Sequence, residues 1–109
     1  MTIHINYAAL VNDNSSADKV SEELLKKAKS FFSGGARKEL LQLFDAEIRL
    51  MAMEVAQRQV NPQDLYQAGT LGLLEALEIY DPGKTEQEFK EFALPFVRTH
   101  MLNARSKAS

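Results

Sequence analysis

The stretch from Asp64 to Pro82, DLYQAGTLGLLEALEIYDP, decides how the rest of the chain is interpreted. Asn61 and Pro62 stand just before it, a capping side chain followed by a proline suited to the first position of a helix. Asp64 places an acid in the first turn, and Asp-Pro-Gly at 81–83 is typical of a turn. The sequence therefore predicts a helix from Pro62 to about Tyr80.

Two glycines, Gly69 and Gly72, lie three residues apart inside this predicted helix. Each costs about 1 kcal/mol relative to alanine in a helix interior, so an exposed helix would rarely keep both. Some other group must therefore approach the helix closely at this point. Tight packing of a neighbouring helix is one explanation, and a binding partner is another.

Two further helices are predicted on the N-terminal side. Apolar residues at helical spacing indicate a first helix from about Ala17, with Gly34–Gly35 as its C-terminal stop. A second helix is predicted from about Ala36 to Gln59. Its apolar stripe is spaced by three and four residues: Leu40, Phe44, Ile48, Met51 and Val55.

A fourth helix is predicted after the turn at 81–83. Thr-Glu-Gln-Glu at 85–88 has the form of a capping box, so the helix should start there. It should continue toward Arg105, with a kink at Pro95. Three phenylalanines follow one another at helical spacing in its first half: Phe89, Phe92 and Phe96.

Length and composition limit the architecture to one small domain. The chain has 109 residues, of which 45% are hydrophobic, enough for a single buried core. The predicted fold is all-α, a compact bundle of about four helices at 17–109, preceded by a flexible N-terminal arm at 1–16. The arm holds only a weak apolar alternation followed by a polar run.

Several function classes are disfavoured. The chain has no cysteine, its two histidines, His4 and His100, are far apart, and no nucleophile-base pair or phosphate-binding loop is present. We therefore expect no metal, no cofactor and no enzymatic activity. No signal peptide or membrane-spanning stretch is present, so a cytoplasmic protein without membrane contact is predicted.

The charge of the chain limits how it can bind nucleic acid. Its formal net charge is -2, so it lacks the basic excess that binds DNA without sequence preference. Any DNA contact must therefore be local.

Taken as a whole, the string at 64–82 resembles the signature of region 2 of bacterial sigma-70-family factors, D-L-x-Q-x-G-x-x-G-L-x-x-A-x-x-x-[FY]-D-P. Downstream, FKEFALPFVRTHML at 89–102 is similar to the F-x-x-[YF]-A-x-P-x-[IV]-R-x-x-M-L string of the flagellar and sporulation branch. The resemblance covers about Gly35 to Arg105. It implies a transcription-initiation module.

For RNA polymerase, the resemblance implies docking of the third helix on the clamp helices of the largest subunits of the core enzyme. The matching residues are Asp64, Gln67, Thr70, Leu71 and Leu74. Residues 64, 67, 71 and 74 are three or four positions apart and so share one face of the helix.

For the promoter, the resemblance implies that the fourth helix engages the minus-ten element. Family members use aromatic side chains there to capture a base flipped out of the DNA strand, because every base has a face that can stack. The residues that we assign to DNA are Phe92, Phe96, Arg98, Thr99 and Arg105. Core packing is the alternative for the phenylalanines.

A second function stays open. Glu88 and Glu91 occupy positions where family members usually carry basic or hydroxyl residues, and an acid near a phosphate repels it. The chain could then be a sigma-like interaction protein that binds polymerase or an anti-sigma factor without melting a promoter. The sequence has no room for a domain that reads the minus-thirty-five element, so we expect a cut-out domain or a partner that supplies this recognition.

Overall fold

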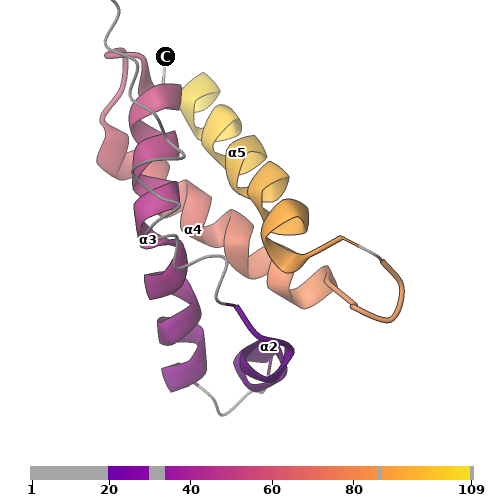
Figure 1. The fold of residues 1–109 in the computed structure, drawn as a ribbon. Helices are drawn as coiled ribbons and strands as arrows, with labels where there is room; N and C mark the ends of the chain where they lie inside the picture. Colours follow the sequence, from indigo (N-terminus) through magenta and orange to yellow (C-terminus); the bar gives the residue numbers. More distant parts are fainter. Residues whose placement is uncertain (1–19, 30–33, 86, 109) are drawn as a thin grey trace, which may run out of the picture.

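The computed structural model describes residues 20–29, 34–85 and 87–108. These residues form four helices and no strand: α2 (Glu22–Lys29), α3 (Gly34–Ala56), α4 (Pro62–Ile79) and α5 (Phe89–Ala108). The predicted all-α bundle is confirmed. Helix α4 crosses obliquely between α3 and α5, and α2 lies near the N-terminal end of α3 (Figure 1). The predicted N-terminal arm lies outside the described residues.

Helix α2 begins later than the sequence predicts. The Ser21 hydroxyl accepts a hydrogen bond from the Leu24 backbone N–H at 3.0 Å, so Ser21 caps the helix and Glu22 is its first residue. A serine in this position satisfies one of the unpaired N–H groups of the first turn. Val20 and Ser21, which the prediction placed inside the helix, are therefore not helical, and the predicted start at Ala17 lies outside the described residues.

The two glycines at 34 and 35 do not stop a helix. They form the first residues of α3, and no described glycine has a positive φ. A glycine that ends a helix usually adopts the left-handed conformation, so the predicted C-terminal stop is wrong. Near the end of α2, the Arg37 side chain donates from Nε to the Ala28 carbonyl oxygen at 2.8 Å instead.

Helix α3 ends at Ala56, earlier than the predicted Gln59. Gln57 and Arg58 have φ values of 49° and 60°, in the left-handed region, and the Gln59 N–H donates to the Ala56 carbonyl oxygen at 2.8 Å. A left-handed residue directs the chain out of a helix. Neither residue is a glycine, so the sequence gave no sign of this end.

Helix α4 follows the sequence prediction closely. The Asn61 side chain accepts a hydrogen bond from the Gln63 N–H at 2.9 Å, and Pro62 is the first residue of the helix. The last residue is Ile79, next to the predicted end at Tyr80. A capping side chain and a proline thus set the start as their chemistry indicates.

Helix α5 begins at Phe89 and not at the predicted capping box. The Thr85 hydroxyl accepts from the Gln87 N–H, two residues on, at 3.1 Å, which is a turn and not a helix cap. The Tyr80 hydroxyl donates to the Gln87 carbonyl oxygen at 2.7 Å and fixes the end of this turn. From Phe89 the helix continues through Pro95.

The core lies where the inward faces of the helices meet. Four members of the predicted stripe on α3 are fully buried: Leu40, Phe44, Ile48 and Val55. Met51 is only partly buried, and Ala52 occupies the buried position beside it. From α4 and α5 the core receives Leu65, Leu73, Val97 and Met101.

The glycine pair of α4 marks its closest approach to α5. A Cβ atom on Gly72 would lie 2.5 Å from the carbonyl oxygen of Phe96 and 2.9 Å from Cα of Val97. A Cβ atom on Gly69 would lie 2.5 Å from Cε of Met101. Of the two explanations for the glycines, packing of a neighbouring helix is therefore confirmed, and at Gly72 the neighbour is backbone.

Candidate functional site

The outward face of α4 is the first candidate surface. Asp64, Gln67 and Leu71 are exposed, and Leu71 is 60% exposed, the largest value among the large hydrophobic residues described. Leu74 is partly buried at the edge of this face. Leu73, two positions on from Leu71 and about 200° around the helix, points into the core. We call Asp64, Gln67, Leu71 and Leu74 the outer α4 face.

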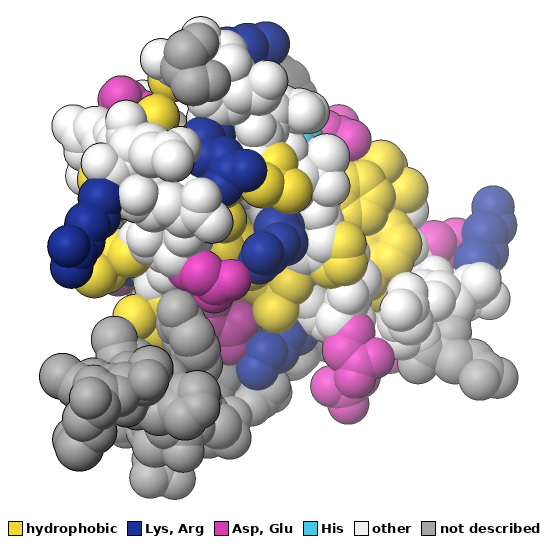
Figure 2. Space-filling model, turned by 90° about the horizontal axis from the view of Figure 1, so that it is seen from above, with side chains coloured by type: hydrophobic (Ala, Val, Ile, Leu, Met, Phe, Trp, Pro, Cys, Tyr) yellow, Lys and Arg dark blue, Asp and Glu magenta, His cyan; other side chains and the backbone are white. Residues whose placement is uncertain are grey.

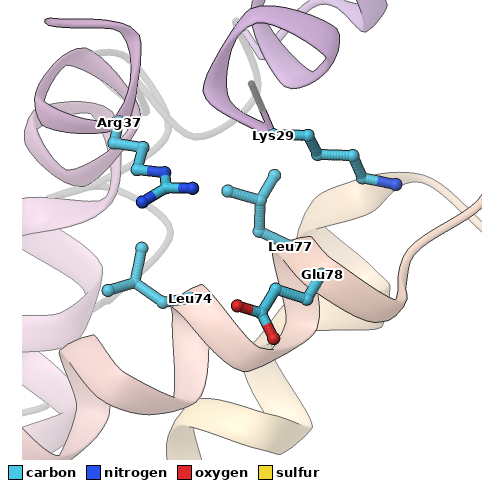
Figure 3. Close-up of a pocket in the computed structure, with 5 residues that line it drawn as sticks. All are labelled: Lys29, Arg37, Leu74, Leu77 and Glu78. Atoms are coloured by element: carbon cyan, nitrogen blue, oxygen red, sulfur yellow. The ribbon is translucent and has the colours of Figure 1, made fainter. Parts of the chain in front are cut away.

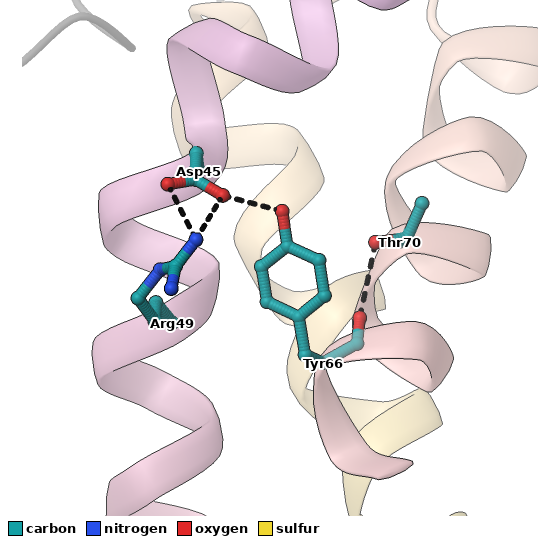
Figure 4. Close-up of polar contacts among 4 residues, drawn as sticks. All are labelled: Asp45, Arg49, Tyr66 and Thr70. Atoms are coloured by element: carbon teal, nitrogen blue, oxygen red, sulfur yellow. Dashed lines mark hydrogen bonds and ion pairs between the residues drawn. The ribbon is translucent and has the colours of Figure 1, made fainter. Parts of the chain in front are cut away.

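Thr70 lies at the border of this face. Its hydroxyl donates to the Tyr66 carbonyl oxygen of the same helix at 3.0 Å, and the side chain is partly buried (Figure 4). The hydroxyl hydrogen is therefore used inside the helix, whereas the oxygen keeps accepting capacity.

A polar cluster beside the outer α4 face joins α4 to α3 (Figure 4). The Tyr66 hydroxyl donates to an Asp45 carboxylate oxygen at 2.5 Å, and Arg49 Nη2 lies 3.1 and 3.2 Å from the two oxygens of the same carboxylate. The Tyr66 bond lowers the pKa of Asp45. Burial, together with the bond to Asp45, raises the pKa of Tyr66 to about 12. The cluster fixes one side of α4 against α3.

This cluster predicts a loss of stability in alkaline solution. The folded pKa of Tyr66 exceeds its usual value of 10.0, so the folded state holds the proton more tightly than the unfolded chain. The contribution to stability is complete below pH 10 and is lost as the pH rises toward 12. Thermal melting across this range should show a fall that is smaller in Tyr66→Phe, and equal falls in both proteins would contradict the assignment.

A surface hollow of about 260 Å³ adjoins Leu74 on the side facing α2 and α3. Figure 3 shows Arg37, Leu74 and Leu77 directed toward one another around it, with Glu78 at its rim. Lys29 also lines the hollow, and its ammonium group donates to the Tyr80 carbonyl oxygen. The outer α4 face thus ends in a hollow lined by two leucines, two cations and one carboxylate.

Aromatic rings form a chain from the core to the surface of α5. Ring centroids are 5.7 Å apart for Phe44 and Phe89, and 5.2 Å apart for Phe89 and Tyr80, for Tyr80 and Phe92, and for Phe92 and Phe96. Phe89 is only 4% exposed, so its role is core packing. Phe92 and Phe96 are partly buried and end the chain at the surface.

The residues assigned to DNA fall on two sides of α5. Phe92, Phe96 and Thr99 lie within about 60° of one another around the helix, whereas Arg98 and Arg105 lie about 180 to 200° from Phe96. Thr99 is exposed and Arg105 is partly buried. The structure therefore brings the aromatic residues and Thr99 together and separates them from both arginines.

Both arginines bond to the C-terminal turn of α3. Arg98 Nη1 lies 3.3 Å from a carboxylate oxygen of Glu54, and Arg105 Nη1 donates to the Val55 carbonyl oxygen at 3.0 Å. A cation at this end of a helix is favoured by the helix dipole. These bonds join residues 44 and 50 positions apart, and no local motif could have revealed them.

The geometry of α4 and α5 agrees with a comparison against protein families. A family model described as sigma-70 region 2 matches residues 43–109, which include most of α3 and all of α4 and α5. The chain belongs to the sigma-70 region 2 family. Members of this family form the region of a sigma factor that takes part in polymerase binding and promoter recognition. This region is a non-enzymatic transcription-initiation domain.

Other comparisons give no further relative of this sigma region 2. No curated protein and no solved structure matches the chain. The family match does not separate the branches of the family, so the likeness to flagellar and sporulation factors stays a prediction.

Among the residues at 20–29, 34–85 and 87–108, no group of three or more histidine, aspartate or glutamate side chains could hold a metal ion. None of the four described helices is long and apolar enough to cross a membrane.

Proposed function

We propose that this sigma region 2 docks on the clamp helices of RNA polymerase through the outer α4 face and engages the promoter minus-ten element through Phe92 and Phe96. The observation that carries the proposal is the 60% exposure of Leu71. A large apolar side chain on a face that the bundle leaves uncovered is suited to a protein interface.

The outer α4 face has the composition of a small interface. Leu71 and Leu74 supply the apolar centre, and Asp64 and Gln67 supply polar groups around it. The hollow next to Leu74 can receive an apolar side chain of a partner helix, since Leu77 lines its inner wall. The expected mode is an elongated helical partner lying along a ridge and filling the hollow beside it.

The aromatic side of α5 supports the DNA part of the proposal. Phe92 and Phe96 present rings near the surface, and base stacking on an aromatic side chain contributes about 1 to 3 kcal/mol per base. Thr99 lies one turn further on and can donate to a phosphate or a base. For Arg98, a phosphate contact requires a strand on the α3 side of α5 and replacement of Glu54 as its partner.

The alternative function, binding to polymerase or to an anti-sigma factor without promoter melting, is favoured by two observations. Arg98, a cation expected to face DNA, is paired with Glu54. Glu88 and Glu91 are both exposed near the start of α5, where they would repel phosphates. Binding to the clamp helices without binding to minus-ten single strands would select this alternative.

Truncation of two side chains on the outer α4 face should weaken polymerase binding. Gln67→Ala combined with Leu71→Ala should weaken binding to the polymerase core by about tenfold or more, because interface anchors typically contribute more than 1 kcal/mol each. Both side chains are exposed, so helical content and melting temperature should remain those of the unaltered chain. Titration of labelled protein with core polymerase measures the affinity.

A matched control is Leu102→Ala on α5. Leu102 is also an exposed leucine, 37% exposed, and lies on a different helix from the proposed interface. Its truncation should leave polymerase affinity unchanged. If Leu102→Ala weakens binding as much as the double variant does, or if the double variant loses helical content in parallel, the outer α4 face is not the docking surface.

A further inference from the structure

The surface of α5 continues past Phe96 with a third flat ring. Phe92, Phe96 and His100 follow one another at intervals of four residues, so their positions are about 6 Å apart along the helix axis and about 40° apart around it. The first two rings are 5.2 Å apart with 37° between their planes. His100 is partly buried and lies next in this row.

A contact from α4 holds the His100 ring. Its Nε2 lies 2.6 Å from a carboxylate oxygen of Glu75, and the two side chains are 32% and 46% exposed. Figure 2 shows a hydrophobic patch with an acidic side chain and a small area of histidine at its edge. A ring that is already held loses less conformational freedom when a ligand binds against it.

We infer that His100 is a further nucleic-acid contact, a third stacking surface for the base next to the one that stacks on Phe96. The inference rests on the proposed DNA role of the aromatic side of α5. Imidazole is planar and stacks on bases as phenyl rings do. The ligand class is a single-stranded nucleic acid with unpaired bases, since the three positions are about 6 Å apart along the helix axis, a distance that suits successive bases of an extended strand.

A purely structural role of His100 is the competing explanation. The pair with Glu75 joins α4 to α5 and could serve the bundle alone. The two roles need different parts of the side chain, since stacking needs a flat ring and the link to Glu75 needs a polar atom. His100→Phe keeps a ring and loses the link, whereas His100→Gln keeps a polar group and loses the ring.

The experiment measures binding of labelled minus-ten single strands to core polymerase carrying the full chain, by fluorescence anisotropy. His100→Gln should weaken binding about fivefold or more, the lower end of base-aromatic stacking, and His100→Phe should remain within about twofold of the unaltered chain. The loss in His100→Gln should be similar at low and high salt, because stacking carries no counterion release.

Every other pattern overturns the inference. Unchanged binding of His100→Gln, equal weakening of both variants, or a loss that vanishes at high salt would exclude stacking on this ring. Phe96→Ala is the reference variant. If Phe96→Ala weakens binding and His100→Gln does not, only the inference on His100 fails. If neither weakens binding, the proposed DNA role of this side of α5 fails as well.

Discussion

Gly72→Leu is expected to lower the free energy of unfolding by about 3 kcal/mol or more, because overpacking against an immovable neighbour exceeds the usual cost of 1 to 3 kcal/mol. The nearest atoms to a new Cβ, at 2.5 and 2.9 Å, belong to the backbone of Phe96 and Val97. Backbone inside a helix cannot rotate away, so α5 must move as a unit. Chemical denaturation followed by circular dichroism measures the effect.

Two other glycines provide graded controls for this prediction. Gly69→Ala meets side-chain atoms of Met101, Val97 and Ile48, the nearest of which is the flexible end of Met101, so it should cost less than Gly72→Ala, which meets backbone. Gly35→Ala meets nothing within 4 Å and lies in α3, so it should raise stability by up to about 1 kcal/mol. Equal free energies of unfolding for Gly72→Ala and the unaltered chain would contradict a close backbone contact between α4 and α5 at Gly72.

Phe96→Ala is expected to weaken binding of minus-ten single strands to the polymerase-bound chain by about 1 to 3 kcal/mol, or roughly five- to 150-fold. Phe96 is the last ring of the aromatic chain, with its one described ring contact to Phe92. Its removal therefore takes away a stacking surface while Phe44 and Phe89 keep packing in the core. Anisotropy titrations with a labelled strand measure the loss.

Leu94→Ala serves as the control for Phe96→Ala. Leu94 is also partly buried on α5, about 200° around the helix from Phe96, so its truncation costs packing without touching the aromatic side. It should lower the melting temperature and leave strand affinity unchanged. Equal losses of strand affinity in the two variants would mean that folding, and not stacking, is what the assay detects.

Sequence chemistry predicted α4 well because its signals are local. Asn61 caps the helix and Pro62 begins it, as their side chains dictate. The resemblance named the residues of the outer α4 face, and the helical period placed them on one side of the helix. The close approach at Gly72 was also foreseeable, since its cost requires a compensating contact. In α4, the capping residues and the packing against α5 therefore favour the same helix.

Some helix boundaries were predicted wrongly because the same residues fit two different local structures. Gly34 and Gly35 fit either end of a helix, and their φ values decided for the start of α3. Thr85 can cap a helix or close a turn, and the bond from the Tyr80 hydroxyl to Gln87 fixes the turn. That bond depends on the packing of Tyr80 against α5, which no short window of sequence contains.

The polar contacts around the candidate site were invisible for a similar reason. Tyr66 and Asp45 are 21 residues apart, and His100 and Glu75 are 25 residues apart. Each pair joins two helices, so it exists only once their packing is known. The sequence could propose the outer α4 face and the phenylalanines of α5, but it could not show that Arg98 pairs with Glu54 of α3.

The most direct test of polymerase docking is site-specific photo-crosslinking from position 71. A photoreactive amino acid in place of Leu71 should, in the complex with core polymerase, form a crosslink that maps to the clamp helices of the largest subunits, because this is the most exposed apolar position of the outer α4 face. The same amino acid in place of Leu102 should form no crosslink to those helices. A crosslink from position 71 to another part of the polymerase, or none in a complex that still forms, would contradict docking through α4.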